Sequence, residues 1–546
     1  MRRYVFFALL LVGTAFRILM LAKYELVNGG EVDVYLADEG VVGLMGKHIL
    51  EGRALPIFFY GQDYLGALEA YCAAVSFGLF GVGFTSLRLV PFLFSLAILA
   101  LVYRFTSVAL SVAAARWATA LTAIAPLYFL QWNLKARGGF VEHVVLVLSV
   151  LVLFWRFYFR EQRDARTAFL LGFTAGLALW VNQLAIAYVA TLGGLAVLST
   201  DRRGLGSVVA GLLLGSSMLL AYNVVHPLAT ARALGRKAVV LNRVPVEERD
   251  ERWIIRGAEK RISALRDGAA KLGLVFGVPP GASVERLGLS EEVREGGEWT
   301  GLRRTLWFVP AAAFGIGLLS LVPYRIPRSS GAFGPDQLIL VLLAVTFVVG
   351  YVSPRYMLPA YPLAAIAFGS WAARLQGGRR AWAALGATSV IAFNVLSWFD
   401  ASAASAGDAG EQTGVRLLSF LEQQDLTRCY SAAPLYHLVF RSKENVLLVP
   451  LQKDRIPGYD RDVEASESLC YVFRDDQEDK RQHVALMQVL EQEHVQYRSA
   501  EVGHYRVLWG FSPRAALSKA VIDRIRTPRD RSVLLGQAGR LEDSWS

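Results

Sequence analysis

The sequence predicts a polytopic α-helical membrane protein that carries a small α/β domain after its last membrane span. Hydrophobic residues make up 54% of the 546 residues, charged residues only 19%, and the mean hydropathy is +0.38. Apolar runs of about 16 to 20 residues recur up to residue 398, each close to the length that a helix needs to cross a bilayer. After residue 398, short expected helices and strands alternate along the chain. These features exclude a pair of soluble globular domains.

The first span covers residues 4–22 and follows Arg2 and Arg3, which place the amino terminus in the cytoplasm. Short arginine-rich loops then fall on one side of the membrane, which supports about eleven spans in a transmembrane domain over residues 1–400. The expected spans cover residues 4–22, 88–103, 117–131, 144–159, 168–183, 184–198, 208–225, 302–322, 338–352, 356–373 and 381–398.

Two long segments between the spans are expected on the external side, residues 23–87 and 226–301. Residues 67–83 within the first are apolar, but the charge parity requires a helix at the outer interface instead of a span. In the second, the apolar residues between Trp253 and Leu265 have the spacing of an amphipathic helix, for which an interfacial position is expected.

The C-terminal part is expected to form an external soluble α/β domain over residues 401–513, followed by a loosely ordered tail over 514–546. Its expected helices cover 415–424 and 483–492, and its strands cover 429–431, 446–450, 469–473, 497–502 and 505–510. The three cysteines lack metal-ligand spacing. A disulfide between Cys429 and Cys470 would suit an external domain, but we expect buried unpaired thiols.

The net charge of +11 does not indicate a nucleic-acid partner. Much of the basic charge lies in short loops between apolar runs, where the positive-inside rule predicts it. No signal-peptide cleavage pattern follows the first apolar run, so we expect this run to remain as a membrane anchor.

Adjacent carboxylates mark the first external loop as the candidate catalytic segment. Asp38 and Glu39 stand at the head of a short amphipathic pattern, and Asp38 has the position of an N-cap at the positive end of a helix. A carboxylate of this kind can act as a general base. Two alternatives stay open: the pair could only cap the helix, or it could hold a divalent cation.

Two basic clusters at the expected outer ends of spans suit a phosphate. Lys135 and Arg137 precede one span, and Arg355 with Tyr356 begins another. The planar fork of arginine fits phosphate oxygens, and a helix N-terminus attracts an anion. The same residues could instead anchor helices among lipid head groups.

Further polar residues are candidates for substrate contact. Tyr60, Gln62 and Tyr64 are typical of sugar recognition, although they could also belong to an aromatic belt. Glu69 lies in an apolar run, where an acid is costly unless it is paired. Glu142 and His143 could bind substrate or ligate a metal, and a structural role is the alternative.

Five stretches resemble one family in their order and spacing: DEGVVGLMGKHILEG, PIFFYGQDYLGALEAY, FGLFGVGFTSLRLVPF, NLKARGGFVEH and SPRYMLPAYPL. The chain resembles the GT-C glycosyltransferases of the family 39 group, which includes the protein O-mannosyltransferases and the lipid A aminoarabinose transferase. The resemblance covers most of the chain. It implies a polyprenyl-phosphate sugar donor, an active site at the external face and an acidic general base in the first external loop, at the position of Asp38 with Glu39 beside it.

The expected function is therefore transfer of a sugar from a lipid phosphate to a glycan, lipid or protein acceptor, in a bacterial inner or plasma membrane. The sequence requires no cofactor, although a divalent cation at Asp38 and Glu39 remains open. A transporter or flippase of lipid-linked glycans is the alternative, but it should show repeated halves and charge at mid-membrane, and neither is evident. A non-catalytic scaffold would leave the acidic loop unexplained.

Overall fold

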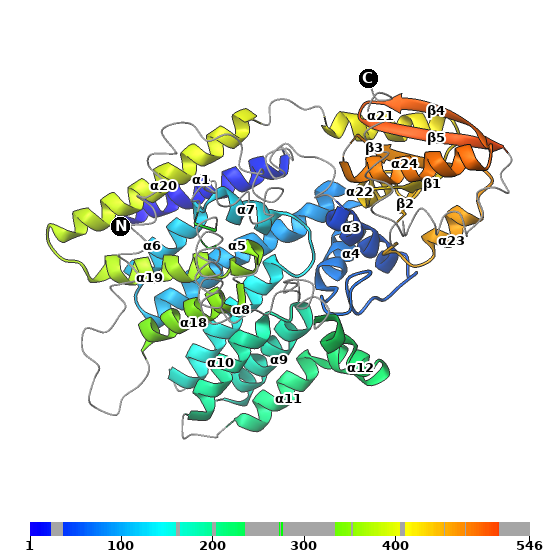
Figure 1. The fold of residues 1–546 in the computed structure, drawn as a ribbon. Helices are drawn as coiled ribbons and strands as arrows, with labels where there is room; N and C mark the ends of the chain where they lie inside the picture. The colour runs from blue at the N-terminus through cyan, green and yellow to red at the C-terminus, as the bar shows by residue number, and fades with distance from the viewer. Residues whose placement is uncertain are drawn as a thin grey trace, which may run out of the picture. The chain divides into compact units, whose positions relative to one another are not determined.

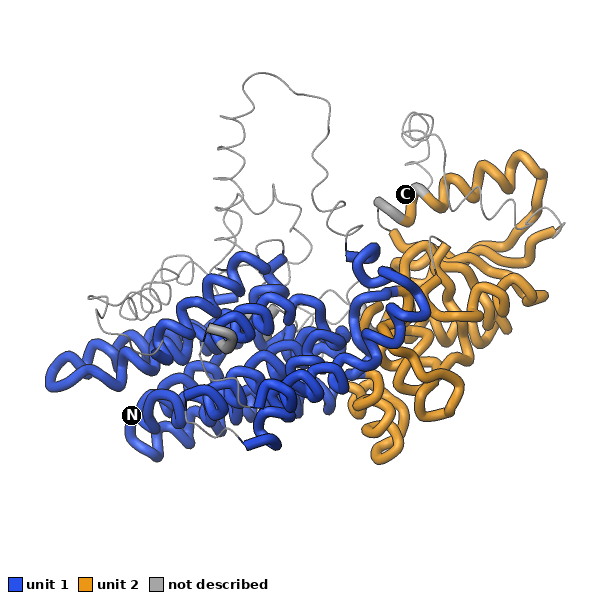
Figure 2. The backbone as a smooth tube through the Cα atoms, turned by 90° about the horizontal axis from the view of Figure 1, so that it is seen from below, with its two compact units in different colours: residues 1–29, 62–69, 88–406 blue, residues 30–61, 70–87, 407–546 orange. Residues whose placement is uncertain are grey.

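The computed structural model describes residues 1–22, 37–159, 164–198, 204–234, 272, 275–276, 334–350, 353–404, 410–451, 454–475 and 477–512. It divides into two compact units (Figure 2). Unit 1 comprises residues 1–29, 62–69 and 88–406, and unit 2 comprises residues 30–61, 70–87 and 407–546. The expected span 302–322, most of the segment 226–301 and the tail 514–546 lie outside the described residues.

Unit 1 is helical. Four helices in the described residues are long and apolar enough to cross a membrane, or up to six spans if each of two bent pairs counts as one. The four are α1 (Arg3–Ala22), α5 (Phe84–Ala109), α8 (Val141–Phe154) with its π-helical extension Trp155–Phe159, and α20 (Arg379–Ala404). The protein is thus an integral membrane protein, while the count of eleven spans remains a prediction.

The other unbroken helices of unit 1 that match predicted spans have 14 to 17 residues, fewer than the 19 to 26 residues of the four long helices. They are α9 (Ala165–Val181), α10 (Ala185–Leu198), α18 (Pro335–Gly350) and α19 (Ala360–Arg374). The bent pairs are α6 (Val112–Ala123) with α7 (Leu127–Leu134), and α11 (Leu205–Gly215) with α12 (Ser217–Val225), at 79° and 60°.

Small residues bring helices of unit 1 into backbone contact. A Cβ added at Gly172 on α9 would lie 1.9 Å from the carbonyl oxygen of Val208 on α11, and one at Gly215 on α11 would lie 2.1 Å from that of Phe173. Such close packing is the usual source of helix association where lipid removes the hydrophobic driving force. Figure 1 shows these two helices side by side.

The predicted span 117–131 is wrong as a single helix, because the chain breaks after α6 and turns into α7 at Pro126. A break exposes carbonyls that lipid cannot satisfy. Here each carbonyl of residues 121–125 accepts a hydrogen bond from a side chain of another helix. The donors are Tyr361 to Leu121, Arg17 to Thr122 and Ala123, Asn394 to Ile124, and Trp398 to Ala125. Arg17, only 1% exposed within α1, thus has a structural partner.

Basic residues gather at one end of unit 1. The Arg116 guanidinium donates to the carbonyl oxygen of Met1 at 3.5 Å. Burial, together with Arg116 and Arg380, lowers the pKa of the amino terminus.

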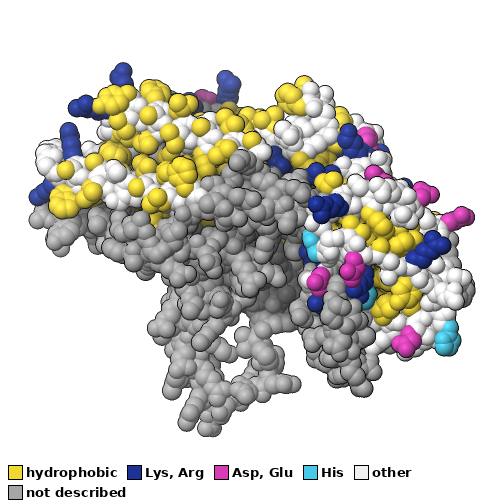
Figure 3. All heavy atoms as spheres, turned by 90° about the horizontal axis from the view of Figure 1, so that it is seen from above, with side chains coloured by type: hydrophobic (Ala, Val, Ile, Leu, Met, Phe, Trp, Pro, Cys, Tyr) yellow, Lys and Arg dark blue, Asp and Glu magenta, His cyan; other side chains and the backbone are white. Residues whose placement is uncertain are grey.

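Figure 3 shows a broad apolar surface over this unit, with Lys and Arg side chains at its edge. Large apolar side chains of α1 and α20 are exposed in the same way. An exposed apolar surface of this kind suits contact with lipid.

Unit 2 contains the small α/β domain. Its five-stranded sheet has the order β2-β1-β3-β5-β4. The strands are β1 (Arg428–Ser431), β2 (Leu447–Pro450), β3 (Leu469–Arg474), β4 (Gln496–Val502) and β5 (Tyr505–Ser512). β1 pairs in parallel with β2 and β3, whereas β5 is antiparallel to both β3 and β4. The predicted strands and terminal hairpin are confirmed.

Four helices accompany the sheet. The predicted helices appear as α21 (Gly410–Gln423) and α24 (Gln477–Gln492), each beginning earlier than expected. Two further helices of six residues each were not predicted from the sequence, α22 (Tyr436–Arg441) and α23 (Tyr459–Glu464). Both are too short for a periodic pattern to stand out.

The expectation of unpaired thiols on β1 and β3 is wrong, because Cys429 and Cys470 form a disulfide. The two residues lie directly opposite each other in the parallel pairing of the strands, with 4.4 Å between their Cα atoms. Strand register sets this distance, and register was not part of the sequence prediction.

The first loop contributes two helices, α3 (Ala37–Leu50) and α4 (Leu68–Phe80). The amphipathic expectation for α3 is wrong, because most of its residues are buried. A Cβ at Gly40 would lie 2.3 Å from the backbone nitrogen of His437 on α22, and Gly43 lies against the ring of Phe440. The ring of Phe77 on α4 also stacks on that of Phe440 at 5.8 Å. The loop and the C-terminal domain thus share a core within unit 2.

Helix α4 has only 13 residues, which span about 20 Å at 1.5 Å per residue. That length is well short of the roughly 30 Å hydrocarbon core. It supports the interpretation of residues 67–83 as a helix that does not cross the membrane.

Candidate functional site

The candidate base lies in the first turn of α3. The helix begins at Ala37, so Asp38 stands one residue inside it and not at the N-cap that the sequence predicts. A carboxylate in a first turn interacts favourably with the helix dipole. The Asp38 side chain is 38% exposed, whereas Glu39 is 1% exposed. Asp38 is therefore the carboxylate of the pair that a substrate can reach.

The C-terminal domain supplies a partner for Asp38. The Nη1 of Arg455 donates to the Oδ1 of Asp38 at 2.6 Å, across 417 residues of sequence. Arg455 follows β2, and its aliphatic stem lies against Gly61, where a Cβ would approach the Arg455 Cγ to 2.9 Å. Arg455 was not predicted, because no local pattern in the sequence connects it with Asp38.

A second contact holds the other end of α3. The carboxylate of Glu444, between α22 and β2, accepts hydrogen bonds from Lys47, Arg53, His48 at 3.0 Å and Tyr459 at 2.6 Å. Burial raises the pKa of Glu444, but these four donors together hold it well below its usual range. We call Glu444 and its four donors the Glu444 cluster.

The predicted sugar contacts fall into both units. Tyr60 is buried in unit 2, where its hydroxyl is hydrogen-bonded to the Nδ1 of His48 at 3.1 Å. Burial raises the pKa of the Tyr60 phenol to about 12. Gln62 and Tyr64 belong to unit 1 and are half-buried.

In unit 1, the loop between α7 and α8 holds the first basic cluster. Lys135 and Arg137 are only 2% and 6% exposed. Gly138 and Gly139 follow with φ of +68° and +80°, a region that favours glycine. The backbone nitrogen of Gly138 donates to the carboxylate of Glu69 at 2.5 Å, so the acid in the apolar run has the partner that its position requires.

Both predicted basic clusters converge on one aromatic ring. The guanidinium of Arg137 lies 4.5 Å from the ring centroid of Trp132 on α7, and that of Arg355 lies 5.7 Å from it. Arg355 also lies 5.6 Å from the ring of Phe140, which stacks on Tyr356 at 6.3 Å. Cation–π contacts of this type favour two neighbouring guanidinium groups despite their like charge.

Trp132 and Phe140 were not predicted as site residues. Both aromatic residues flank the basic loop, and this proximity was the available signal. Both rings contact Arg355, which lies far along the chain, and no local pattern connects them with it.

Glu142 and His143 begin α8 and are 1% and 3% exposed. The His143 ring meets Tyr188 edge-on at 5.6 Å, and neither ring nitrogen has a hydrogen-bond partner among the described residues. Within the described part of the chain, no three His, Cys, Asp or Glu side chains gather closely enough to hold a metal ion. Among the described residues, therefore, no third metal-binding side chain accompanies Glu142 and His143, or Asp38 and Glu39.

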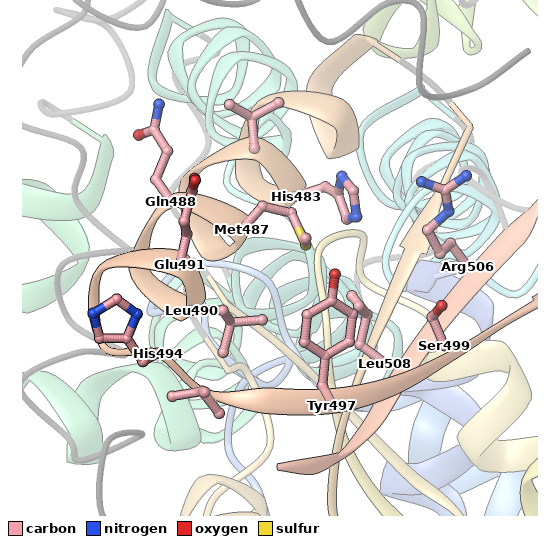
Figure 4. Close-up of a pocket in the computed structure, with 12 residues that line it drawn as sticks. His483, Met487, Gln488, Leu490, Glu491, His494, Tyr497, Ser499, Arg506 and Leu508 are labelled. Atoms are coloured by element: carbon pink, nitrogen blue, oxygen red, sulfur yellow. The ribbon is translucent and has the colours of Figure 1, made fainter. Parts of the chain in front are cut away.

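A pocket of about 540 Å³ lies elsewhere in unit 2, between α24 and the β4–β5 hairpin. Figure 4 shows Met487 and Leu490 of α24 facing Tyr497 and Leu508 of the strands. Burial, and then Arg506, lowers the pKa of His483 in this pocket to about 4. The lining includes none of the predicted site residues.

The basic residues of unit 1 and Asp38 of unit 2 can perform different chemical tasks. In unit 1, buried cations beside membrane-spanning helices can bind an anion, and burial makes such an interaction strong because water does not screen it. In unit 2, Asp38 is accessible and oriented, so it can accept a proton from a bound hydroxyl group.

The overall fold has solved counterparts. ArnT from Cupriavidus metallidurans, bound to undecaprenyl phosphate, matches with a TM-score of 0.54 and 16% identity over 93% of this chain and 98% of that chain. The Archaeoglobus fulgidus oligosaccharyltransferase tethered to an acceptor peptide matches with a TM-score of 0.53 and 14% identity, over 94% and 74%. The chain has the GT-C fold.

The same oligosaccharyltransferase in complex with Zn and sulfate matches the GT-C chain with a TM-score of 0.52 and 15% identity, over 92% and 72%. No protein-family model and no curated protein sequence matches the chain. At such low sequence identities, the structural similarity shows the GT-C fold and nothing further. This similarity confirms the fold that the sequence motifs predict.

Proposed function

We propose that this protein is a membrane glycosyltransferase that moves a sugar from a polyprenyl-phosphate donor to a glycan, lipid or protein acceptor at the external face. The observation that carries the proposal is the convergence of Arg137 and Arg355 on Trp132, beside Lys135, in a helical unit with the GT-C fold. A lipid phosphate combines the anion that these cations suit with the tail that the membrane accepts. ArnT of the same fold binds undecaprenyl phosphate, which supports this choice.

The proposed reaction is a single displacement. Asp38 accepts the proton of the acceptor hydroxyl, and the oxygen attacks the anomeric carbon of the donor sugar. The bond from that carbon to the phosphate oxygen breaks, and the configuration inverts. The released polyprenyl phosphate gains negative charge, which Arg137, Arg355 and Lys135 stabilise. Gln62 and Tyr64 are proposed to contact the sugar.

The disulfide between Cys429 and Cys470 supports an external location of the C-terminal domain. Disulfides persist in oxidising compartments such as the bacterial periplasm and are rare in the cytosol. We accordingly propose a bacterial plasma membrane with the reaction on its outer side.

Binding of undecaprenyl phosphate to the full-length protein in detergent tests the donor assignment. Arg137→Ala and Arg355→Ala should each weaken binding about tenfold or more, because a charged hydrogen-bonding partner of the phosphate is lost. Arg104→Ala, on the half-exposed α5, is the matched control and should bind like the wild type. Wild-type affinity in both first variants would remove the phosphate assignment.

Sugar transfer from a lipid-linked donor extracted from the host membrane tests the base. Asp38→Asn keeps the size of the side chain and should lower turnover about a hundredfold or more while undecaprenyl phosphate still binds. Glu39→Gln, at a buried position, separates the roles of the two carboxylates. Full transfer by the double variant would refute the assignment of Asp38.

A further inference from the structure

The C-terminal domain contacts α3 next to the candidate base, through Arg455 and Asp38. We propose that Arg455 is a positioning residue, which fixes the carboxylate of Asp38 so that it can accept the proton of the acceptor. The inference rests on the proposed function, because it assigns Arg455 a role only through a catalytic Asp38.

The contact leaves one carboxylate oxygen available. Nη1 of Arg455 donates to Oδ1 of Asp38 at 2.6 Å, and no hydrogen bond from the described residues reaches Oδ2. A carboxylate on a short side chain can otherwise rotate about its terminal torsion, which is broad. Holding Oδ1 therefore directs Oδ2, and a base in a fixed direction shortens the search for the reactive geometry.

Arg455 is itself held at both its backbone and its stem. Its backbone nitrogen donates to the hydroxyl of Tyr436 at 2.8 Å, and that hydroxyl donates to Asp454 at 3.0 Å. Tyr436 begins α22 and is fully buried. The stem of Arg455 lies against Gly61, which has a φ of +76°. The guanidinium thus starts from a fixed point in unit 2.

The same helix is held at its other end. Lys47 and His48 in the last turn of α3 bind Glu444, and Gly40 in its first half lies against the backbone of α22. The C-terminal domain therefore contacts α3 at the first turn, the middle and the last turn. Asp38 cannot shift relative to Arg455 without breaking these contacts.

The contribution of this ion pair to stability does not explain the arrangement. The side chains of Arg455 and Asp38 are 34% and 38% exposed. Pairs exposed to this extent stabilise a protein by about 0–1 kcal/mol. Loss of Arg455 should thus affect activity far more than folding.

Kinetics of the full-length protein in detergent, with the lipid-linked donor described above, test the proposal. Arg455→Met keeps the stem on Gly61 and removes the charge. We expect turnover to fall about 10- to 100-fold, the scale of a misplaced catalytic group, while the donor KM stays unchanged. Arg455→Lys should recover part of the turnover.

Lys480→Met is the matched control, because Lys480 pairs with Asp475 at a similar exposure of 35% and 48% in the same domain. It should turn over like the wild type. Wild-type turnover in Arg455→Met would overturn the inference, as would equal losses in the Lys480 variant. Unfolding midpoints measured on the same samples identify any loss that comes from folding.

A double-mutant cycle with Asp38→Asn separates positioning from direct substrate contact. If Arg455 acts through Asp38, the double variant should be no slower than Asp38→Asn alone. Losses that multiply would overturn the inference. Full activity of Asp38→Asn would instead refute the proposed function, whereas an impaired Asp38→Asn beside a fully active Arg455→Met would refute only the positioning role.

Discussion

Substitution of Glu444 should lower the stability of unit 2. The Glu444 side chain is 11% exposed, and its donors Lys47 and His48 are 13% and 7% exposed. Arg53 is 46% exposed and also pairs with Glu51, so its contribution is discounted. Hydrogen bonds to a buried charge contribute about 1.5–3 kcal/mol each.

Glu444→Gln keeps the volume of the side chain and one acceptor oxygen, so only part of these contributions is lost. We expect unit 2 to lose about 2–4 kcal/mol, mainly because cations lose a buried partner. For a unit of this size the apparent unfolding midpoint should fall by about 5–15 °C. Scanning fluorimetry of the full-length protein in detergent at pH 7 measures this change.

The effect should depend on pH. Burial raises the pKa of Glu444 and its four donors outweigh burial, so the folded pKa lies below the unfolded value of about 4.3. A depressed pKa contributes stability above the unfolded value, and this stability is lost as the pH falls below it. The gap between the melting temperatures of the wild type and Glu444→Gln should therefore stay constant from pH 7 to about pH 5 and narrow progressively as the pH falls further.

Glu51→Gln is the matched control, because the Glu51 side chain contacts the same Lys47 and Arg53 but is 39% exposed. It should cost less than about 1 kcal/mol. The reasoning is refuted if Glu444→Gln unfolds within about 2 °C of the wild type, or if both variants lose equal stability.

Three further predictions follow from single contacts. A methyl at Gly40 would lie 2.3 Å from a backbone nitrogen of α22, so Gly40→Ala should sharply reduce the yield of folded protein on size-exclusion chromatography. Gly78→Ala should not reduce this yield, because a methyl there would lie 3.6 Å from the nearest atom, Cδ1 of Leu50. Replacing Cys429 and Cys470 by Ser opens a 41-residue loop and should cost about 3–4 kcal/mol in denaturant unfolding, and wild-type stability would contradict this. Trp132→Leu should weaken undecaprenyl phosphate binding about 5- to 10-fold, and equal affinity would count against the aromatic contact.

Local patterns sufficed for much of the fold. The strands at 429–431 and 469–473 are short apolar runs between polar turns, so their type is evident from the sequence. The break near Pro126 was hidden, because it interrupts an apolar run and its donors lie far along the chain. Hydropathy measures composition and not the places where side chains can replace helical hydrogen bonds.

The candidate residues divide in the same way. Arg137 and Arg355 were predicted from charge next to an apolar run, a local property. The partner of Asp38 was not, because Arg455 lies 417 residues away and resembles any exposed arginine of a loop. Only the packing of α3 against the C-terminal domain brings the two together.

The break after α6 also sets an order of events during synthesis of the protein. Asn394 and Trp398, which donate to its carbonyls, lie 270 and 273 residues downstream. At about 5–20 residues per second, the ribosome reaches them roughly 15–55 s after it has made the break. Until then these carbonyls lack their native donors, and lipid supplies none. The bend that presents Trp132 is therefore translated early and completed only when the membrane receives α20.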